Sequence, residues 1–169
     1  MKRRESLKSW GTRFIFNLFP CYRRTGVKVT YVSPDYHEVR IELPLNWKTR
    51  GYNGSTFGGS MYACVDPVYM TMISWALGKQ YIAWDKAATI DFRKPGRGKL
   101  FCTFRLPPGE LDGIRAELEN AERVERIYDV ELVDAAGVVH AAFRKTIQIR
   151  KRKPKPVAGS APSAPAATP

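Results

Sequence analysis

"NGSTFGGSMYACVDPVYM", residues 53–70, joins a glycine-rich loop to an apolar segment that spans residues 60–77 and stops at Gly78. The segment is apolar on nearly every side, which is typical of a helix buried in the middle of a fold. Its length would also suit a membrane-spanning helix. Asp66 and Pro67 lie in its middle, however, and strand-like patterns flank it on both sides. We therefore predict a buried central helix.

Asp66 is a carboxylate in this otherwise apolar helix. Burying a carboxylate costs several kcal/mol unless the group is paired or used in chemistry. Pro67 has no amide hydrogen, so it leaves the carbonyl of Ala63 without its helical partner and predicts a kink beside Asp66. Two interpretations stay open: Asp66 is catalytic, or it is bonded to loop amides in a bent helix.

Alternating apolar and polar residues predict six strands around the helix. They form three expected hairpins, in residues 27–44 around Pro34-Asp35, in residues 87–107 with the turn "KPGRGK", and in residues 123–151 across Ala135 to Gly137. A short amphipathic helix over residues 109–121 is expected at an edge of the sheet. This order predicts an α+β fold in which an antiparallel sheet curls around the long helix. One sheet covers the helix only partly, so a symmetric partner is expected.

The chain divides into three predicted parts. Residues 1–24 hold a basic amphipathic helix, residues 25–153 the folded domain, and residues 154–169 a disordered tail rich in Pro and Ala. The N-terminus resembles a twin-arginine signal, but Arg13 interrupts the apolar region and no cleavage site follows. The helix with Leu7, Trp10, Phe14 and Leu18 on one face either docks on the domain or on a partner subunit, or makes weak contact with an anionic membrane surface.

The net charge of +12 is concentrated at the two ends of the chain. Residues 1–28 carry +7 and residues 144–169 carry another +7, whereas residues 29–143 are at −2. A folded nucleic-acid module carries its positive charge on its own surface, so we predict no nucleic-acid partner.

Cysteine and histidine usage argues against a disulfide framework and against a metal site. The three cysteines are widely spaced, and neither His37 nor His140 has a partner at metal-ligand spacing. We therefore expect a cytoplasmic protein without a cofactor. Both histidines fall in alternating strand patterns, where we expect surface positions.

The element order and the stretch "GSTFGGSMYACVD" resemble the hotdog fold of acyl-CoA thioesterases, in the branch related to the phenylacetate-pathway enzymes. That branch carries a loop Asn, then GxxHGG, then an Asp nine residues after the His. Here Gly54, Phe57, Gly58, Gly59 and Asp66 stand at the Gly, His, Gly, Gly and Asp positions. Gly51 occupies the place of the loop Asn, and Asn53 lies two residues later. The stretch also resembles a bacterial clade labelled a domain of unknown function or a tetrameric acyl-CoA thioesterase.

The resemblance implies a thioester hydrolase that acts on acyl-CoA or another acyl thioester, as a homodimer or homotetramer. Asp66 is the expected general base or nucleophile, reaching the substrate of a neighbouring subunit. The first amides of the central helix, at Gly58 and Gly59, are expected to hold the thioester oxygen, since helix N-terminal amides lack internal partners. Asp85 provides a second carboxylate or pairs with Lys86.

Substrate contacts are expected from the glycine-rich loop, at Asn53, Gly54 and Phe57, and from a basic turn. The turn carries Arg93, Lys94, Arg97 and Lys99, which either hold the phosphates of CoA or form a solvated basic surface. Because Phe57 cannot hydrogen-bond a thioester, a non-catalytic hotdog protein that binds acyl-CoA or lipid is the alternative.

Overall fold

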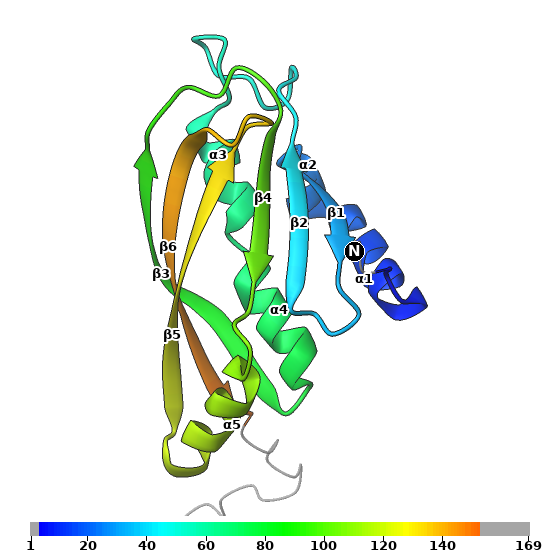
Figure 1. Ribbon diagram of the computed structural model, residues 1–169, viewed down its shortest axis with the longest axis vertical. Helices are drawn as coiled ribbons and strands as arrows, with labels where there is room; N and C mark the ends of the chain where they lie inside the picture. The colour runs from blue at the N-terminus through cyan, green and yellow to red at the C-terminus, as the bar shows by residue number, and fades with distance from the viewer. Residues whose placement is uncertain (1–3, 153–169) are drawn as a thin grey trace, which may run out of the picture.

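The computed structural model describes residues 4–152 and contains one six-stranded sheet with helices on its concave face and at its ends (Figure 1). In chain order the elements are α1 (Leu7–Leu18), α2 (Pro20–Arg24), β1 (Lys28–Val32), β2 (Glu38–Leu43), α3 (Gly58–Val65), α4 (Val68–Leu77), β3 (Tyr81–Phe92), β4 (Leu100–Arg105), α5 (Glu110–Asn120), β5 (Arg123–Val133) and β6 (Val139–Lys151). All strand pairs are antiparallel. This is the α+β arrangement that the resemblance predicts. The predicted tail, residues 154–169, lies outside the described residues.

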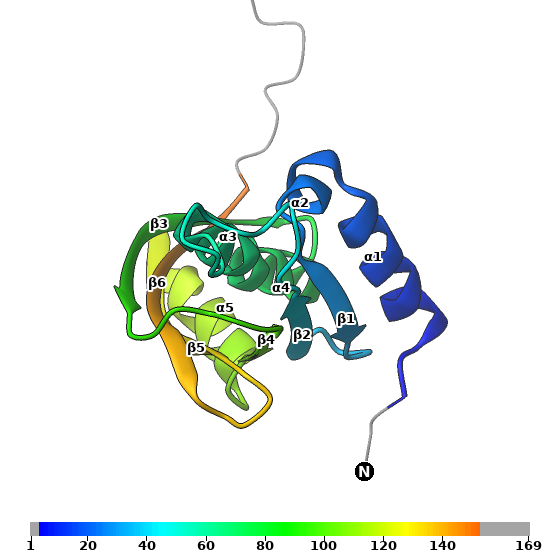
Figure 2. The same cartoon turned by 90° about the horizontal axis from the view of Figure 1, so that it is seen from above.

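The central helix is buried as predicted, but it is divided in two. Helices α3 and α4 meet at Asp66 and Pro67, where the chain makes a turn. Seen from above, both helices lie inside the curve of the sheet (Figure 2). The break follows from the missing amide hydrogen of Pro67. Next to it, the carbonyl of Cys64 accepts a hydrogen bond of 2.8 Å from the buried hydroxyl of Tyr22. This hydrogen bond gives the buried carbonyl at the kink a partner, and it thereby stabilises the kink.

The strand order β1-β2-β4-β5-β6-β3 shows that the hairpin predicted over residues 87–107 is wrong. Strand β3 pairs with β6, and β4 pairs with β2 and β5. The segment between them instead crosses from one side of the sheet to the other. It is held there because Thr56 donates its amide, at 2.8 Å, and its hydroxyl, at 3.2 Å, to the carbonyl of Gly96. The other two predicted hairpins, β1 with β2 and β5 with β6, are confirmed.

Helix α1 and the residues before it cover the outer edge of β1. Their side chains make hydrogen bonds to the backbone of β1 in the place of a neighbouring strand. The Asn17 side chain accepts a hydrogen bond from the amide of Val29 and donates one to the carbonyl of the same residue. A carboxylate oxygen of Glu5 accepts from the amide of Val32. One sheet edge is thereby closed, whereas the outer edge of β3 has no strand beside it within residues 4–152.

Two further outcomes concern the histidines and the apolar helix. His37 lies near the surface, but the surface position expected for His140 is wrong, because its ring is buried and its Nε2 lies 3.2 Å from a carboxylate oxygen of Asp134. The alternation of the strand did not reveal this local partner. In the described part of the chain, no helix combines the length and apolarity needed to cross a bilayer.

We predict that Asn17→Ala lowers the free energy of unfolding by about 1–2 kcal/mol, because two backbone groups at the edge of β1 lose their partner. Urea unfolding measures the loss, and amide hydrogen exchange should show faster exchange at Val29. Thr30→Ala removes a more exposed bond on the same strand and is the control, with an expected change within about 0.5 kcal/mol. Equal effects of the two substitutions would contradict the edge-closing role of Asn17.

Candidate active site

A buried lysine joins the two carboxylates that the sequence singled out. Lys145 Nζ lies 3.0 Å from Oδ1 of Asp66 and 2.7 Å from Oδ1 of Asp85. The lysine side chain is fully buried, whereas the side chains of Asp66 and Asp85 are 44% and 21% exposed. Oδ1 of Asp85 has no hydrogen bond of regular geometry, so its contact with the ammonium is mainly electrostatic. The partner of the Asp66 carboxylate is therefore the Lys145 ammonium and not the loop amides considered above.

The helix break and the alternation of β3 bring the carboxylates to the lysine. Asp66 follows the last residue of α3, at the break before Pro67. Asp85 has the same parity in β3 as the buried Tyr81 and Ala83, and it pairs with the buried Ile147 of β6, so its side chain faces the core. The break and the alternation thus place both carboxylates on the inner side of the sheet.

Sequence reasoning missed Lys145, although the strand pattern contained a signal for it. Phe143, Ile147 and Ile149 share the inward face of β6, and Lys145 has the same parity in the strand. A lysine at an inward position of a buried strand requires a partner of opposite charge. The alternative expected pair between Asp85 and Lys86 is wrong: the Lys86 ammonium contacts Glu125 instead.

Burial and charge act against each other in this cluster. Burial lowers the pKa of Lys145, but the two neighbouring carboxylates outweigh burial and raise this pKa above its usual value. Burial raises the pKa of Asp85, although Lys145 opposes the shift. The pKa of Tyr62, whose ring lies 5.4 Å from the ammonium, is raised by burial and by Asp66. The two carboxylates therefore favour the protonated form of the lysine.

The start of α3 is the second part of the candidate site. The amides of Gly58 and Gly59 are the first two of the helix, and among the described residues no acceptor faces them. A Cβ on Gly59 would come within 2.3 Å of the Phe57 ring, so this exposed ring lies directly against the glycine. The helix start therefore combines two free amide donors with an aromatic surface.

The loop before α3 has its own internal bonds. The side-chain oxygen of Asn53 accepts hydrogen bonds from the amide and hydroxyl of Ser55. Gly54 has a backbone φ of 79°, a conformation that residues with a side chain rarely adopt. Asn53 and Gly54 thus shape the loop that precedes Phe57.

Asp66 and the helix start cannot act on one thioester within a single chain. Seven residues of helix separate Gly59 from Asp66, which corresponds to roughly 10 Å. A carbonyl whose oxygen contacts the amides would lie far beyond the reach of a water held by the carboxylate. The two parts can meet on one substrate only if they come from different copies of the chain.

The predicted basic turn is the crossover between β3 and β4, and its cations differ in availability. Arg93 contacts Asp91 and Glu131, and Lys99 contacts Glu42. Lys94 and Arg97 are exposed and, among the described residues, make no ion pair. Because this crossover is hydrogen-bonded to Thr56, its two free cations flank the segment that leads into α3.

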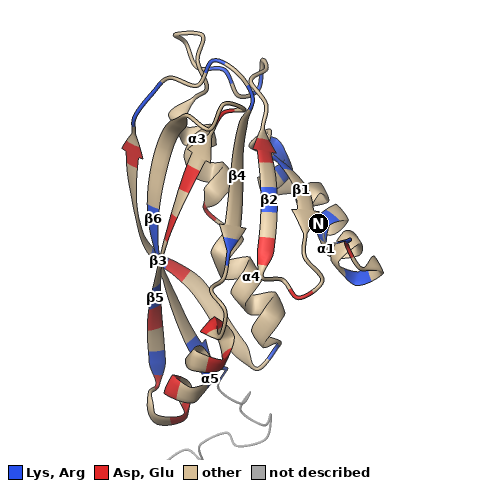
Figure 3. Cartoon of the chain, viewed as in Figure 1, with Lys and Arg blue, Asp and Glu red and all other residues tan. Residues whose placement is uncertain are grey.

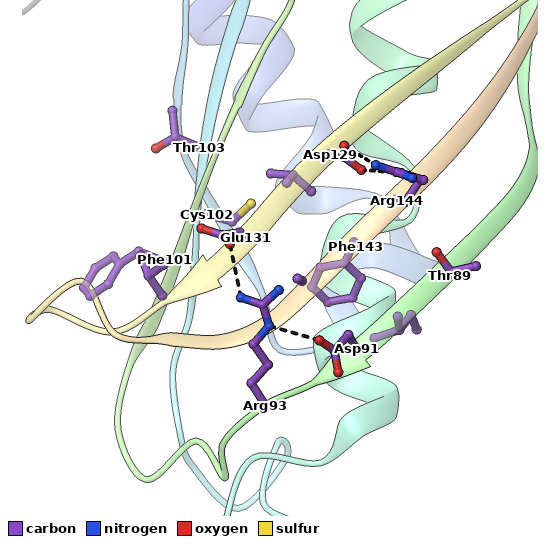
Figure 4. A pocket seen from close by; sticks show the side chains of 14 residues that line it. Thr89, Asp91, Arg93, Phe101, Cys102, Thr103, Asp129, Glu131, Phe143 and Arg144 are labelled. Atoms are coloured by element: carbon purple, nitrogen blue, oxygen red, sulfur yellow. Dashed lines mark hydrogen bonds and ion pairs between the residues drawn. The ribbon is translucent and has the colours of Figure 1, made fainter.

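A separate hollow opens on the face of the sheet turned away from α3 and α4 (Figure 4). Its volume is about 790 Å³, and it lies where β4 and β5 diverge. Arg144 makes two hydrogen bonds to the carboxylate of Asp129, and Arg93 contacts carboxylates on the same wall. Its charges are paired with one another, so we place the candidate active site at Asp66 instead. Within residues 4–152, no cluster of three His, Cys, Asp or Glu side chains is arranged to hold a metal ion.

The curved sheet around a broken central helix defines a hotdog protein. The chain belongs to the family described as Domain of unknown function (DUF4442), whose sequence model matches residues 9–149. No curated protein matches the sequence.

Solved structures share this fold at low sequence identity. PA5026 from Pseudomonas aeruginosa, a protein of unknown function described as a probable thioesterase, has a TM-score of 0.76 and 20% identity, over 88% of this chain and 99% of its own. The E. coli PaaI protein from the phenylacetic acid degradation operon has a TM-score of 0.61 and 17% identity, over 89% and 97% of the two chains. Thioesterase HI1161 from Haemophilus influenzae has a TM-score of 0.65 and 10% identity, over 89% and 96%.

We predict that Lys145→Met destabilises the protein by about 2–3 kcal/mol at neutral pH, because two partly buried carboxylates lose their counter-charge. The loss should depend on pH. Lys145 lowers the pKa of Asp85, so its removal raises that pKa further above the unfolded value. A raised carboxyl pKa contributes stability below the unfolded pKa, and this contribution is lost as the pH rises through the folded pKa.

Urea unfolding at a pH of about 4.5 and of about 7.5 tests this dependence, with a larger deficit expected at the higher pH. Lys86→Met, which removes the exposed partner of Glu125, is the matched control and should leave the urea midpoint unchanged. A deficit that is independent of pH would show that Lys145 acts through packing alone.

Proposed function

We propose that the protein hydrolyses acyl thioesters, with acyl-CoA as the substrate class and Asp66 as the catalytic carboxylate. The observation that carries the proposal is the pairing of a buried ammonium with a carboxylate that stays 44% exposed. Such a carboxylate is held in one orientation and still reaches solvent. The thioesterases among the structures with this fold support the same class of reaction.

In the proposed mechanism, Asp66 is a general base. Lys145 donates to Oδ1 of Asp66, so Oδ2 is available to accept a proton from a water molecule. The water oxygen attacks the thioester carbon, and the carbonyl oxygen becomes an oxyanion. When the carbon–sulfur bond breaks, the protonated Asp66 returns its proton to the leaving thiolate. The products are the free acid and the thiol.

The oxyanion would be bound by the amides of Gly58 and Gly59 from another copy of the chain. Free donors at the positive end of a helix stabilise a developing negative charge. The separation of roughly 10 Å along the helix requires the second copy. The uncovered outer edge of β3, which carries Asp85, offers a strand to pair with it.

Recognition of CoA would use the crossover between β3 and β4. Lys94 and Arg97 make no ion pair among residues 4–152, so both are available to phosphate groups. Arg93 and Lys99, which the sequence placed in the same role, are already paired with carboxylates.

One observation favours the alternative, an acyl-binding protein without turnover. The exposed rings of Phe57 and Phe92 both lie beside the helix start, the first against Gly59 and the second near Gly58. Aromatic surface there binds an acyl chain or a pantetheine arm without supplying a proton donor.

We predict that Asp66→Asn lowers kcat for acyl-CoA hydrolysis by at least about 100-fold, because the base is lost while the shape of the side chain is kept. Release of free thiol from purified protein and acyl-CoAs of increasing chain length measures the effect. Asp91→Asn is the control, since Asp91 is an exposed carboxylate that pairs with Arg93, and its rate should stay within about twofold.

Two results would reject the proposal or redirect it. Turnover by the Asp66→Asn variant at the wild-type rate would exclude Asp66 as the base. Binding of acyl-CoA by the wild type without any release of thiol would establish the alternative.

We further predict that Gly58→Leu abolishes activity, because the added side chain blocks the approach to the helix amides. A Cβ at this position already lies 3.2 Å from the exposed Phe92 ring, so the ring has to shift to admit a leucine side chain. If each site combines residues of two chains, coexpressed Gly58→Leu and Asp66→Asn chains form mixed dimers with one intact site. The mixture should then recover about a quarter of the wild-type activity. Two inactive variants that stay inactive together would place both parts in one chain.

A further inference from the structure

Helix α1 packs on the domain, yet most of its large apolar side chains point to solvent and not toward the domain. On its inner face Ser9 is buried, Phe16 packs against Trp75 of α4, and Asn17 makes polar contacts to the backbone of β1. Six large apolar side chains are instead at least half exposed: Leu7, Trp10, Phe14, Ile15, Leu18 and Phe19. We call these six residues the apolar face of α1. Exposed apolar groups gathered on one helix indicate a binding surface.

Positive charge surrounds this face. Arg4, Lys8, Arg23 and Arg24 are exposed, and Figure 3 shows basic segments along α1 and α2. Within residues 4–28 the acidic residue is Glu5, and its carboxylate is already bound by Arg13 and by the backbone amide of Val32. No acidic side chain of this segment is therefore free to neutralise the cations.

A hollow of about 420 Å³ lies at the end of α1, next to the apolar face. Its lining combines an exposed indole with three cations, from Leu18, Pro20, Arg23, Arg24, Trp47 and Lys48. Guanidinium and ammonium groups bind phosphate. Indole rings favour the boundary between hydrocarbon and lipid headgroups.

We infer that α1 and α2 bind the surface of a bilayer that contains anionic lipids. The apolar face enters the boundary between headgroups and acyl chains, and Arg23, Arg24 and Lys48 contact lipid phosphates. A 12-residue helix is about 18 Å long, so it lies in the plane of the interface and does not cross the bilayer. The bonds of Asn17 and Glu5 to β1 keep the helix on the domain, which is thereby held at the membrane.

The charge pattern favours an anionic surface over a second copy of the chain. In a symmetric dimer the same surface lies on both sides of the interface. The apolar face of α1 in such a dimer would bring the clustered cations of both copies together, which is unfavourable. A bilayer rich in anionic headgroups complements both the apolar residues and the charge.

Flotation of the full chain with vesicles tests the inference. Wild-type protein should bind vesicles of phosphatidylcholine with phosphatidylglycerol and should not bind vesicles of phosphatidylcholine alone. Because each cation near an anionic surface contributes about fivefold to partitioning, Arg23→Glu, Arg24→Glu and Lys48→Glu together should lower binding by on the order of 100-fold. Trp10→Ser, Phe14→Ser and Leu18→Ser together should lower it by at least about tenfold.

Matched controls change equivalent residues elsewhere on the surface. Lys79→Glu, Lys86→Glu and Arg123→Glu reverse the same number of charges, and Ile127→Ser removes an apolar side chain that is 62% exposed. Neither control should alter binding by more than about twofold. Quenching of tryptophan fluorescence by brominated lipid provides a reading on the unsubstituted protein; Trp10→Phe should lose part of the quenching, and the remainder is expected from the exposed Trp47 beside the same face.

Three outcomes would overturn the inference. Equal binding to both kinds of vesicle removes the role of the cations. Full binding by the triple serine variant removes the role of the apolar face. Self-association of the wild type that the triple serine variant loses assigns the face to a second copy of the chain.

Discussion

Lys145 carries a positive charge inside the curved sheet, and the arrangement of the site follows from the cost of keeping that charge away from water. The cost is offset by two carboxylates from different elements. Pro67 interrupts the central helix and leaves Asp66 at the break, and Asp85 faces inward from β3 on the same side of the strand as Ala83. The break would weaken a helix without this charge beside it. Here a helix end and an edge strand reach the same ammonium.

The two carboxylates differ in what they can do, although one lysine holds both. Asp85 is the more buried, and burial raises its pKa. Asp66 stays open to solvent and keeps one oxygen that Lys145 does not bind. A division between a buried structural carboxylate and an exposed reactive one is the kind of difference that separates catalytic roles. In our proposal Lys145 and Asp85 position Asp66, and Asp66 alone activates the water.

One edge of the sheet is covered and the other is open among the described residues, and both edges bear on the functions that we propose. At β1, Asn17 and Glu5 satisfy the backbone of the edge from a helix, which keeps α1 on the domain with its apolar side outward. At β3, the described residues leave the outer edge uncovered. The first edge thus presents a surface for lipid in our inference, and the second a strand for another copy. Both follow from how backbone donors and acceptors at a sheet edge find partners.

The sequence by itself determined most of the elements and their approximate bounds, because hydrophobic periodicity and turn residues act locally, but it missed α2 and the first half of β3. It also singled out Asp66, Gly58 and Gly59 as candidate site residues, since a carboxylate in an apolar helix and a glycine pair at its start are visible in the chain. It did not determine that β3 pairs with β6 instead of β4, because strands with similar alternation accept many partners. The partner of Asp85, the burial of His140 and the role of Lys145 were likewise decided only by the tertiary structure. A charge is stabilised by neighbours in space, and Lys145 lies 79 residues from Asp66 along the chain.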